Sequence, residues 1–214
     1  MNVVLDNLDQ FLNGMQQTVV LTVLSFAIAF LIGVVVAGFR VSPVPPLRAL
    51  GTVYVTLIRN TPLAVLLLLF YVGFPKIGIL LSPFSSGIIM LSAYTGTFVA
   101  ETVRAGVNSV AVGQAEAARA LGMSFPQVLT VVILPQALRT VVQPLGSIFS
   151  ALLRNSAVVT IIGVSNLTKI VQSVQADTAT NVPAYVGGAL AYLLLTIPTG
   201  QAIGVIERRV AIKR

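Results

Sequence analysis

The sequence predicts an all-α integral membrane protein with five membrane-spanning helices. Its 214 residues are 56% hydrophobic and only 9% charged, and its mean hydropathy is +0.96, which excludes an ordinary water-soluble domain. No charged residue occurs between Asp9 and Arg40 or between Asp177 and Glu207. Each gap exceeds the roughly 20 apolar residues that a helix needs to cross a bilayer. No linker is long enough to separate two units, so we expect one membrane domain over 1–214.

The five spans follow from the apolar runs and the residues that interrupt them. The first run has only threonine and serine as polar exceptions, and prolines at positions 43, 45 and 46 mark the loop that follows it. The second span carries Arg59-Asn60-Thr61-Pro62 in its first half, and a turn-rich loop at 75–86 leads to the third. We expect the spans at 18–39, 51–74, 87–107, from 136 to beyond 153, and 184–206.

Three further segments do not read as spans. Residues 157–164 are apolar but too short to cross alone, so we expect them to fold back or to cap the bundle. Residues 166–182 read as a polar, partly helical loop. The N-terminus carries Asp6 and Asp9 and no basic segment, which favours a retained first helix over a cleaved signal peptide.

Lysine and arginine predict the orientation. An external N-terminus and a cytoplasmic C-terminus place nine basic residues inside and only Lys76 and Lys169 outside, as the positive-inside rule requires. The nine are Arg40, Arg48, Arg104, Arg119, Arg139, Arg208, Arg209, Lys213 and Arg214. The basic residues sit singly between apolar runs, so the pI of about 10.4 reflects topology and does not indicate a nucleic-acid partner.

The composition excludes several kinds of chemistry in this chain. It has no cysteine and no histidine, which removes disulfides, thiol chemistry, Cys/His metal sites and histidine bases. It also has no Gly-Lys dipeptide and therefore no phosphate-binding P-loop. We expect no catalytic residue, no metal site and no cofactor in this chain.

One polar segment, about 108–135, has an unusual composition. Alanines at 115, 117, 118 and 120 give a short helix a slim surface that could enter a groove on another protein. Gly122 suits the left-handed position that ends such a helix. Ser124 then suits the N-cap of a second short helix, with Pro126 in its first turn.

The spacing of Glu116-Ala117-Ala118, Gly122 and Val132-Ile133-Leu134-Pro135 resembles the cytoplasmic coupling loop of bacterial ABC-importer permeases, apart from Val132, where isoleucine is commoner. Further matches to their polar amino-acid subfamily occur at 59–63, 100–106, 134–139 and 162–164. Segments 40–44 and 97–108 resemble the glutamate permeases of actinobacteria.

The resemblance implies a five-helix type I ABC-importer permease fold in the bacterial plasma membrane. It implies an ATPase dimer that carries ATP and Mg²⁺, a second permease subunit, identical or related, and an extracellular solute-binding protein. The implied substrate is a polar amino acid, glutamate first, with glutamine or aspartate as alternatives. The implied ATPase-coupling residues are Gly113, Gln114, Glu116, Ala117, Ala118 and Gly122. For Glu116 the alternative is a solvated side chain paired with Arg119.

A repeated local pattern marks candidates for the translocation path. Leu57-Ile58-Arg59-Asn60-Thr61 and Leu152-Leu153-Arg154-Asn155-Ser156 each set an arginine, an amide and a hydroxyl among aliphatic residues. Intramembrane arginines usually face a protein interior or a water-filled cavity, and guanidinium suits carboxylate. The alternative is that both arginines neutralise backbone carbonyls at broken helix ends and hold the fold. The candidates are Arg59, Asn60, Thr61, Thr97, Glu101, Arg154 and Asn155.

Three alternatives stay open. Glu101 and Arg104, one turn apart, form either a local ion pair or part of a gate. A secondary transporter driven by protons or sodium would be expected to show inverted repeats and midplane carboxylates, whereas Glu101 lies near one face. A scaffold subunit of a membrane assembly would not require the coupling-loop spacing or arginines within spans.

Overall fold

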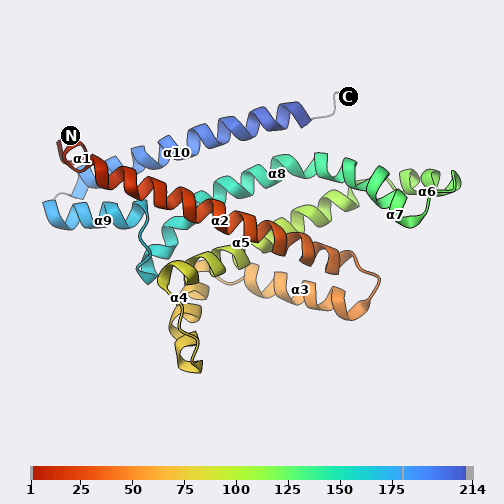
Figure 1. The fold of residues 1–214 in the computed structure, drawn as a ribbon, viewed down its shortest axis with the longest axis horizontal. Coiled ribbons are helices and arrows are strands. Elements are labelled where there is room, and N and C mark those ends of the chain that lie inside the picture. The colour runs from red at the N-terminus through yellow and green to blue at the C-terminus, as the bar shows by residue number, and fades with distance from the viewer. Residues whose placement is uncertain (1, 180, 211–214) are drawn as a thin grey trace.

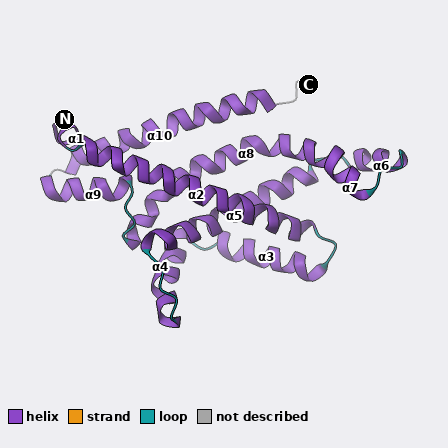
Figure 2. Ribbon diagram, in the orientation of Figure 1, coloured by secondary structure: helices purple, strands orange, loops and turns teal. Residues whose placement is uncertain are grey.

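The computed structural model describes residues 2–179 and 181–210, and throughout these ranges the regular secondary structure is helical (Figure 2). The helices of the first half are α1 (Asn2–Asp6), α2 (Leu8–Val41), α3 (Pro45–Arg59), α4 (Leu63–Gly73), the 3₁₀ helix η1 (Phe74–Ile77) and α5 (Pro83–Asn108). Those of the second half are α6 (Val112–Ala120), α7 (Phe125–Gln127), the π-helix η2 (Val128–Ile133), α8 (Leu134–Asn155), the 3₁₀ helix η3 (Ser156–Ile162), α9 (Leu167–Thr178) and α10 (Asn181–Val210).

The long helices α2, α5, α8 and α10 run along the long axis of the molecule, and α4 projects away from them (Figure 1). Glycines allow the central ones to approach closely. A Cβ at Gly33 would come within 2.4 Å of Val99, and one at Gly106 would come within 2.3 Å of Val141. Small residues at such contacts let two helix backbones pack directly, which is how helices associate within lipid. Helix α5 is therefore clamped between α2 and α8.

Among the described residues, three helical segments are long and apolar enough to span a bilayer by themselves: Leu8–Val41, Thr130–Ile162 and Asn181–Arg209. The predicted first, fourth and fifth spans lie within them. The predicted third span coincides with α5, which is not among the three. Serines and threonines such as Ser92, Thr95 and Thr97 are buried in α5. Because α2 and α8 cover this helix, it needs less hydropathy than a helix that faces lipid.

The predicted second span is not a single straight helix. It is divided into Pro45–Arg59 and Leu63–Ile77, which are bent by 102° at the break. Pro62 supplies no backbone N–H and clashes with a helical continuation, so α3 ends at Arg59 and α4 starts again at Leu63. These two helices together give a fourth candidate span in the described residues only if the bent pair is counted as one broken span.

The short apolar segment at 157–164 caps the bundle, as its length predicted. Most of it forms η3, which ends at Gly163 in the left-handed conformation, φ +81°. Its side chains Val159, Ile162 and Val164 join a core cluster with Leu63, Leu67 and Leu91. The predicted partly helical loop at 166–182 contains α9 and the start of α10.

Buried Asn166 connects this cap to the rest of the molecule. Its side-chain carbonyl accepts bonds from the Thr160 hydroxyl at 2.8 Å and from the Lys169 N–H at 2.9 Å, which caps α9. Its amide donates to the Ser156 carbonyl at 2.8 Å, and the next N–H, of Leu167, donates to Thr18 in α2 at 2.9 Å. The Asn166 side chain thus satisfies buried polar groups of η3 and α9, and the adjoining backbone N–H ties them to α2.

Replacing Asn166 with alanine is expected to lower the unfolding free energy by about 2–4 kcal/mol, because several buried groups lose their partners at once. The midpoint of SDS-induced unfolding of the purified chain, followed by circular dichroism, measures this change. Asn13→Ala is the matched control, because Asn13 is an exposed asparagine of α2. Equal midpoints for the two variants would contradict the assigned role of Asn166.

Candidate functional site

The region 108–135 folds as a short helical hairpin at one extremity of the molecule, beyond the ends of α5 and α8 (Figure 1). Helix α6 stops as the sequence predicted. Gly122 has a left-handed φ of +80°. The N–H of Gly122 donates to the Arg119 carbonyl, and the N–H of Met123 donates to that of Ala118. This pair of bonds is a Schellman motif, and it fixes the turn that separates α6 from α7.

The second helix of the hairpin also begins where it was predicted. Ser124 precedes α7, and its N–H donates to the side-chain carbonyl of Gln127 at 2.8 Å, one half of a capping box. The hydroxyl of Ser124 donates to the same oxygen at 2.9 Å instead of accepting from the backbone. The chain then continues through the π-helix η2 directly into α8. The fourth span was expected to begin near residue 136, and α8 begins at Leu134.

The exposed face of α6 differs from the predicted one at a single position. Ala118 is only 5% exposed, so it packs inside the hairpin and offers no contact surface. Glu116 and Ala117 are exposed, as are Gly113 and Gln114. Two aliphatic side chains, Val112 and Leu121, are 73% and 83% exposed. Glu116 forms no ion pair with Arg119 within the described part of the chain. The hairpin therefore presents a small, partly apolar face around one carboxylate.

At the first repeated arginine motif, side chains satisfy the broken end of α3. The amide of Asn60 donates to the Thr56 carbonyl and the hydroxyl of Thr61 to that of Leu57, both at 2.8 Å. The Thr56 carbonyl also accepts the backbone N–H of Asn60 at 3.4 Å. The N–H of Thr61 donates to the Ile58 carbonyl, so the Thr61 hydroxyl takes the place of that N–H at Leu57. The guanidinium of Arg59 lies over the ring of Phe98, 5.1 Å from its centroid, within the range of a cation–π contact.

The second motif also marks a helix end. Helix α8 ends at Asn155, and the Ser156 hydroxyl donates to the Leu153 carbonyl at 2.6 Å. Arg154 is exposed and Asn155 is half-buried. The repeated pattern therefore builds two helix ends through hydroxyl side chains and, in the first motif, an amide, and it leaves an exposed arginine at each. Neither Arg59 nor Arg154 forms an ion pair among the described residues.

A polar stripe on α8 joins the surroundings of these two arginines. Residues 140, 143, 147, 150 and 154 are spaced three or four apart and share one face of the helix. They are Thr140, Gln143, Ser147, Ser150 and Arg154. One hollow of about 410 Å³ is lined by Arg59, Phe98, Glu101, Gln143 and Ser147, among others. A second, of about 320 Å³, is lined by Gln143, Ser147, Ser150, Arg154 and Glu207, among others.

Because the two hollows share Gln143 and Ser147, they form one polar groove along α8, with an arginine in each part. We refer to these two hollows together as the α8 groove. The signal for this groove is present in the sequence, as polar residues at helical spacing within the predicted fourth span.

Glu101 lies where the α8 groove meets a charged cluster. Its carboxylate binds Arg40 at the end of α2, and its second oxygen binds Arg104 at 2.9 Å. It thereby joins α2 to α5 and also lines the groove. Thr97, another predicted path residue, is fully buried, and its hydroxyl donates to the Tyr94 carbonyl at 2.7 Å. The structure does not bring Thr97 into the groove.

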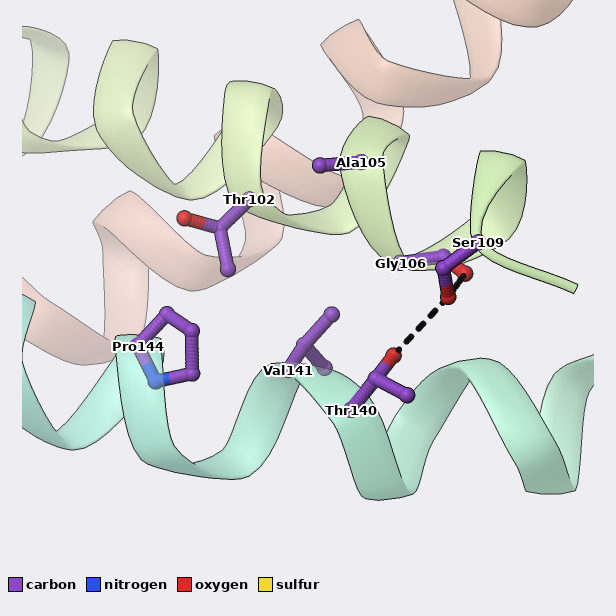
Figure 3. A pocket seen from close by; sticks show the side chains of 7 residues that line it. All are labelled: Thr102, Ala105, Gly106, Ser109, Thr140, Val141 and Pro144. Carbon is purple, nitrogen blue, oxygen red and sulfur yellow. Dashed lines mark hydrogen bonds between the residues drawn. The ribbon is translucent and has the colours of Figure 1, made fainter.

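Towards the hairpin, α5 and α8 enclose a further hollow of about 280 Å³ (Figure 3). Thr102, Ala105 and Ser109 face it from α5, opposite Thr140, Val141 and Pro144 of α8. The hydroxyls of Ser109 and Thr140 lie 3.4 Å apart and close its end. A continuous series of hollows thus runs beside α8 from Arg154 to the base of the hairpin.

Known proteins match this chain over nearly its whole length. A probable glutamine ABC transporter permease protein of Bacillus subtilis (strain 168) is 38% identical over 208 residues, with 97% of this chain and 96% of the relative covered. A glutamate transport system permease protein of Corynebacterium glutamicum is 34% identical, with 92% of each chain covered. The actinobacterial likeness is therefore present, at a lower identity than the Bacillus match.

A solved structure described as an amino acid ABC transporter with histidines superposes with a TM-score of 0.92 at 33% identity, and 96% of each chain is covered. This agreement confirms the predicted all-α, type I importer-permease fold. The family described as "Binding-protein-dependent transport system inner membrane component" matches residues 29–212. The chain therefore belongs to this family of membrane permease components.

Proposed function

We propose that this chain is the membrane-embedded permease subunit of an ATP-driven importer of a polar amino acid, with glutamate as the substrate. It works beside a second permease subunit, identical or related, and receives substrate from an extracellular solute-binding protein. ATP and Mg²⁺ are bound by a separate ATPase dimer. The observation that carries the proposal is the exposed α6–α7 hairpin, which presents an unpaired carboxylate and exposed aliphatic residues beyond the end of the bundle.

The hairpin is suited to transmit motion from an ATPase. Gly113, Gln114, Glu116 and Ala117 supply the contact surface, whereas Ala118 and Gly122 shape the hairpin itself. η2 connects the hairpin without a break to α8, which lines the groove. A displacement of the hairpin therefore acts on the wall of the translocation path, which is the coupling that alternating access requires.

Orientation in the bacterial plasma membrane follows from the charges on the fold. The α2–α3 connection, the hairpin and the end of α10 lie at one end of the molecule, and α9 and the start of α2 lie at the other (Figure 1). Seven of the nine basic residues assigned inside lie in described segments at the first end; Lys213 and Arg214 lie outside the described residues. The positive-inside rule makes this end cytoplasmic. It also puts the hairpin where ATP is found.

The α8 groove supplies the chemistry for an acidic amino acid. Arg59 and Arg154 are free of ion pairs in the described chain and can bind carboxylates, whereas the Glu101 carboxylate is held by Arg40 and Arg104 at the edge of the groove. Glutamate carries two carboxylates, which match the two arginines. Asn60, Thr61 and Asn155 act at the helix ends beside these arginines, and buried Thr97 acts through packing. Glutamine, the substrate named for the Bacillus relative, would use one arginine only.

A secondary transporter is less well supported. Glu101 is the one acid of α5, and it is already held by Arg40 and Arg104 near the hairpin end. A scaffold subunit would have no use for a groove that carries two unpaired arginines.

Reconstituting the permease with its ATPase in liposomes, and measuring which amino acid stimulates ATP hydrolysis, tests the proposal directly. Stimulation by an ion gradient without ATP would contradict it.

Ala117→Trp is expected to reduce co-purification of the ATPase at least tenfold, because a bulky side chain on the exposed face of α6 blocks entry into a groove. Ala49→Trp is the matched control, since Ala49 is an exposed alanine at the same end of the molecule. Pull-down of the tagged permease measures both. Wild-type recovery of the ATPase with Ala117→Trp would exclude the hairpin as the docking element.

A reporter enzyme that is active only in the cytoplasm is expected to work when fused after Arg214 and to fail when fused before Met1. A reporter active only outside should give the reverse pattern. Activity of the cytoplasmic reporter at the N-terminus alone would overturn the orientation, and with it the cytoplasmic position of the hairpin.

Arg59→Gln and Arg154→Gln are each expected to reduce glutamate uptake roughly 10- to 100-fold, because one charged hydrogen bond contributes about 1.5–3 kcal/mol. Uptake of glutamine, which lacks the second carboxylate, should fall less. Arg48→Gln controls for the loss of an exposed arginine outside the groove. Radiolabelled uptake is measured in cells with matched expression. Normal glutamate uptake by both variants would leave selectivity to the binding protein.

A further inference from the structure

A second groove between α8 and α10 is distinct from the polar one. It encloses about 210 Å³ and is lined by Phe26, Val142, Leu145, Gly146, Phe149, Ile203 and Ile206. The rings of Phe26 and Phe149 meet edge to face, with centroids 5.0 Å apart. None of these side chains is polar. At this volume the groove is smaller than the roughly 300–1,000 Å³ pockets that enclose drug-sized ligands, so it fits a narrow, flexible apolar group.

Arginines stand one turn beyond this apolar groove on both of its helical walls. Arg139 lies three residues before Val142 on α8, and Arg209 lies three residues after Ile206 on α10. Both pairs share a helix face by this spacing. The two helices run antiparallel, and Gly146 contacts Ile203, so these two turns lie at the same end of the groove. The groove is therefore apolar within the bilayer and cationic where it reaches the interface.

These two arginines are available to a ligand. Both are exposed, and neither forms an ion pair among the described residues. The charged neighbours on the same turns are Glu207 and Arg208. Glu207 lines the opposite, polar groove of α8, so it does not occupy the apolar one. The apolar window of α10 is only 6% buried, so this helix lies at the edge of the chain where lipid has access.

We propose that this groove is a binding site for an anionic phospholipid. One acyl chain lies between Phe26, Val142 and Ile206, and the phosphate is held by Arg139 and Arg209. Basic residues between transmembrane helices at the interface hold anionic headgroups in this way, by charge attraction and by hydrogen bonds to phosphate oxygens. The proposal depends on insertion in a membrane and not on the transported substrate, so its failure would leave the proposed function untouched.

The bound lipid has a mechanical consequence. Gly146 contacts Ile203 so closely that an added Cβ would come within 2.2 Å, and this contact separates the apolar groove from the polar one. A lipid in the apolar groove stabilises the position of α10 against α8. It thereby acts on the helix that lines the translocation path, from the lipid side.

The test uses the full chain, purified in detergent and incubated with equal amounts of phosphatidylglycerol and phosphatidylcholine of identical acyl chains. Native mass spectrometry counts the lipids retained. The wild type is expected to prefer phosphatidylglycerol, and this preference should fall about fivefold for each arginine removed in Arg139→Gln and Arg209→Gln. Arg48→Gln, an exposed arginine on α3, should keep the wild-type preference.

Two further arms separate a lipid from its headgroup and from a protein partner. Val142→Phe fills the groove and should lower retention of both lipids, while glycerol phosphate alone should not compete at the same concentration. The chain has no native cysteine, so Ile206→Cys reports on contacts between copies. Equal retention of both lipids by the wild type, an Arg139/Arg209 double variant that behaves like Arg48→Gln, or disulfide-linked dimers through position 206 would each overturn the proposal.

Discussion

The constraint on which this fold depends is that backbone polar groups within a bilayer must find partners inside the protein. Several of the helix breaks in this chain recruit a nearby polar side chain. Asn60 and Thr61 donate to carbonyls in the last turn of α3, and Ser156 donates to one at the end of α8. Asn166 does the same for η3 and α9. These side-chain bonds stabilise the helix breaks and allow the chain to turn at these positions.

The same constraint explains why the residues of the arginine motifs differ in their contacts. The amide and hydroxyl of the first motif donate to helix carbonyls, whereas its guanidinium forms no ion pair among the described residues. Arg59 is held in place by the ring of Phe98 without losing its charge. In this motif the amide and the hydroxyl, and not the arginine, bind the carbonyls at the helix end. The polar neighbours build the helix end, and the arginine extends from it into the groove.

The sequence was informative wherever a local rule acts alone. Gly122 ends α6, Ser124 begins α7, and the segment at 157–164 is too short to span, because glycine geometry, capping and helix length are local properties. It was less informative where tertiary contacts decide. The 102° bend at Pro62 and the burial of Ala118 depend on what packs beside them. The close approach of α5 to α2 and α8 also explains why a helix with modest hydropathy lies at the centre of the bundle.

The polar stripe of α8 requires a polar environment within the membrane. Gln143, Ser147 and Arg154 are exposed in the single chain, although α8 is part of a membrane-spanning segment. Lipid cannot solvate such a face, whereas water or a second protein surface can. A second permease subunit placed over the stripe would convert an open groove into an enclosed, hydrated path with α8 as one wall. The hairpin lies in continuity with that same helix, so the polar stripe and the exposed face of α6 are connected through η2 by a continuous helical segment.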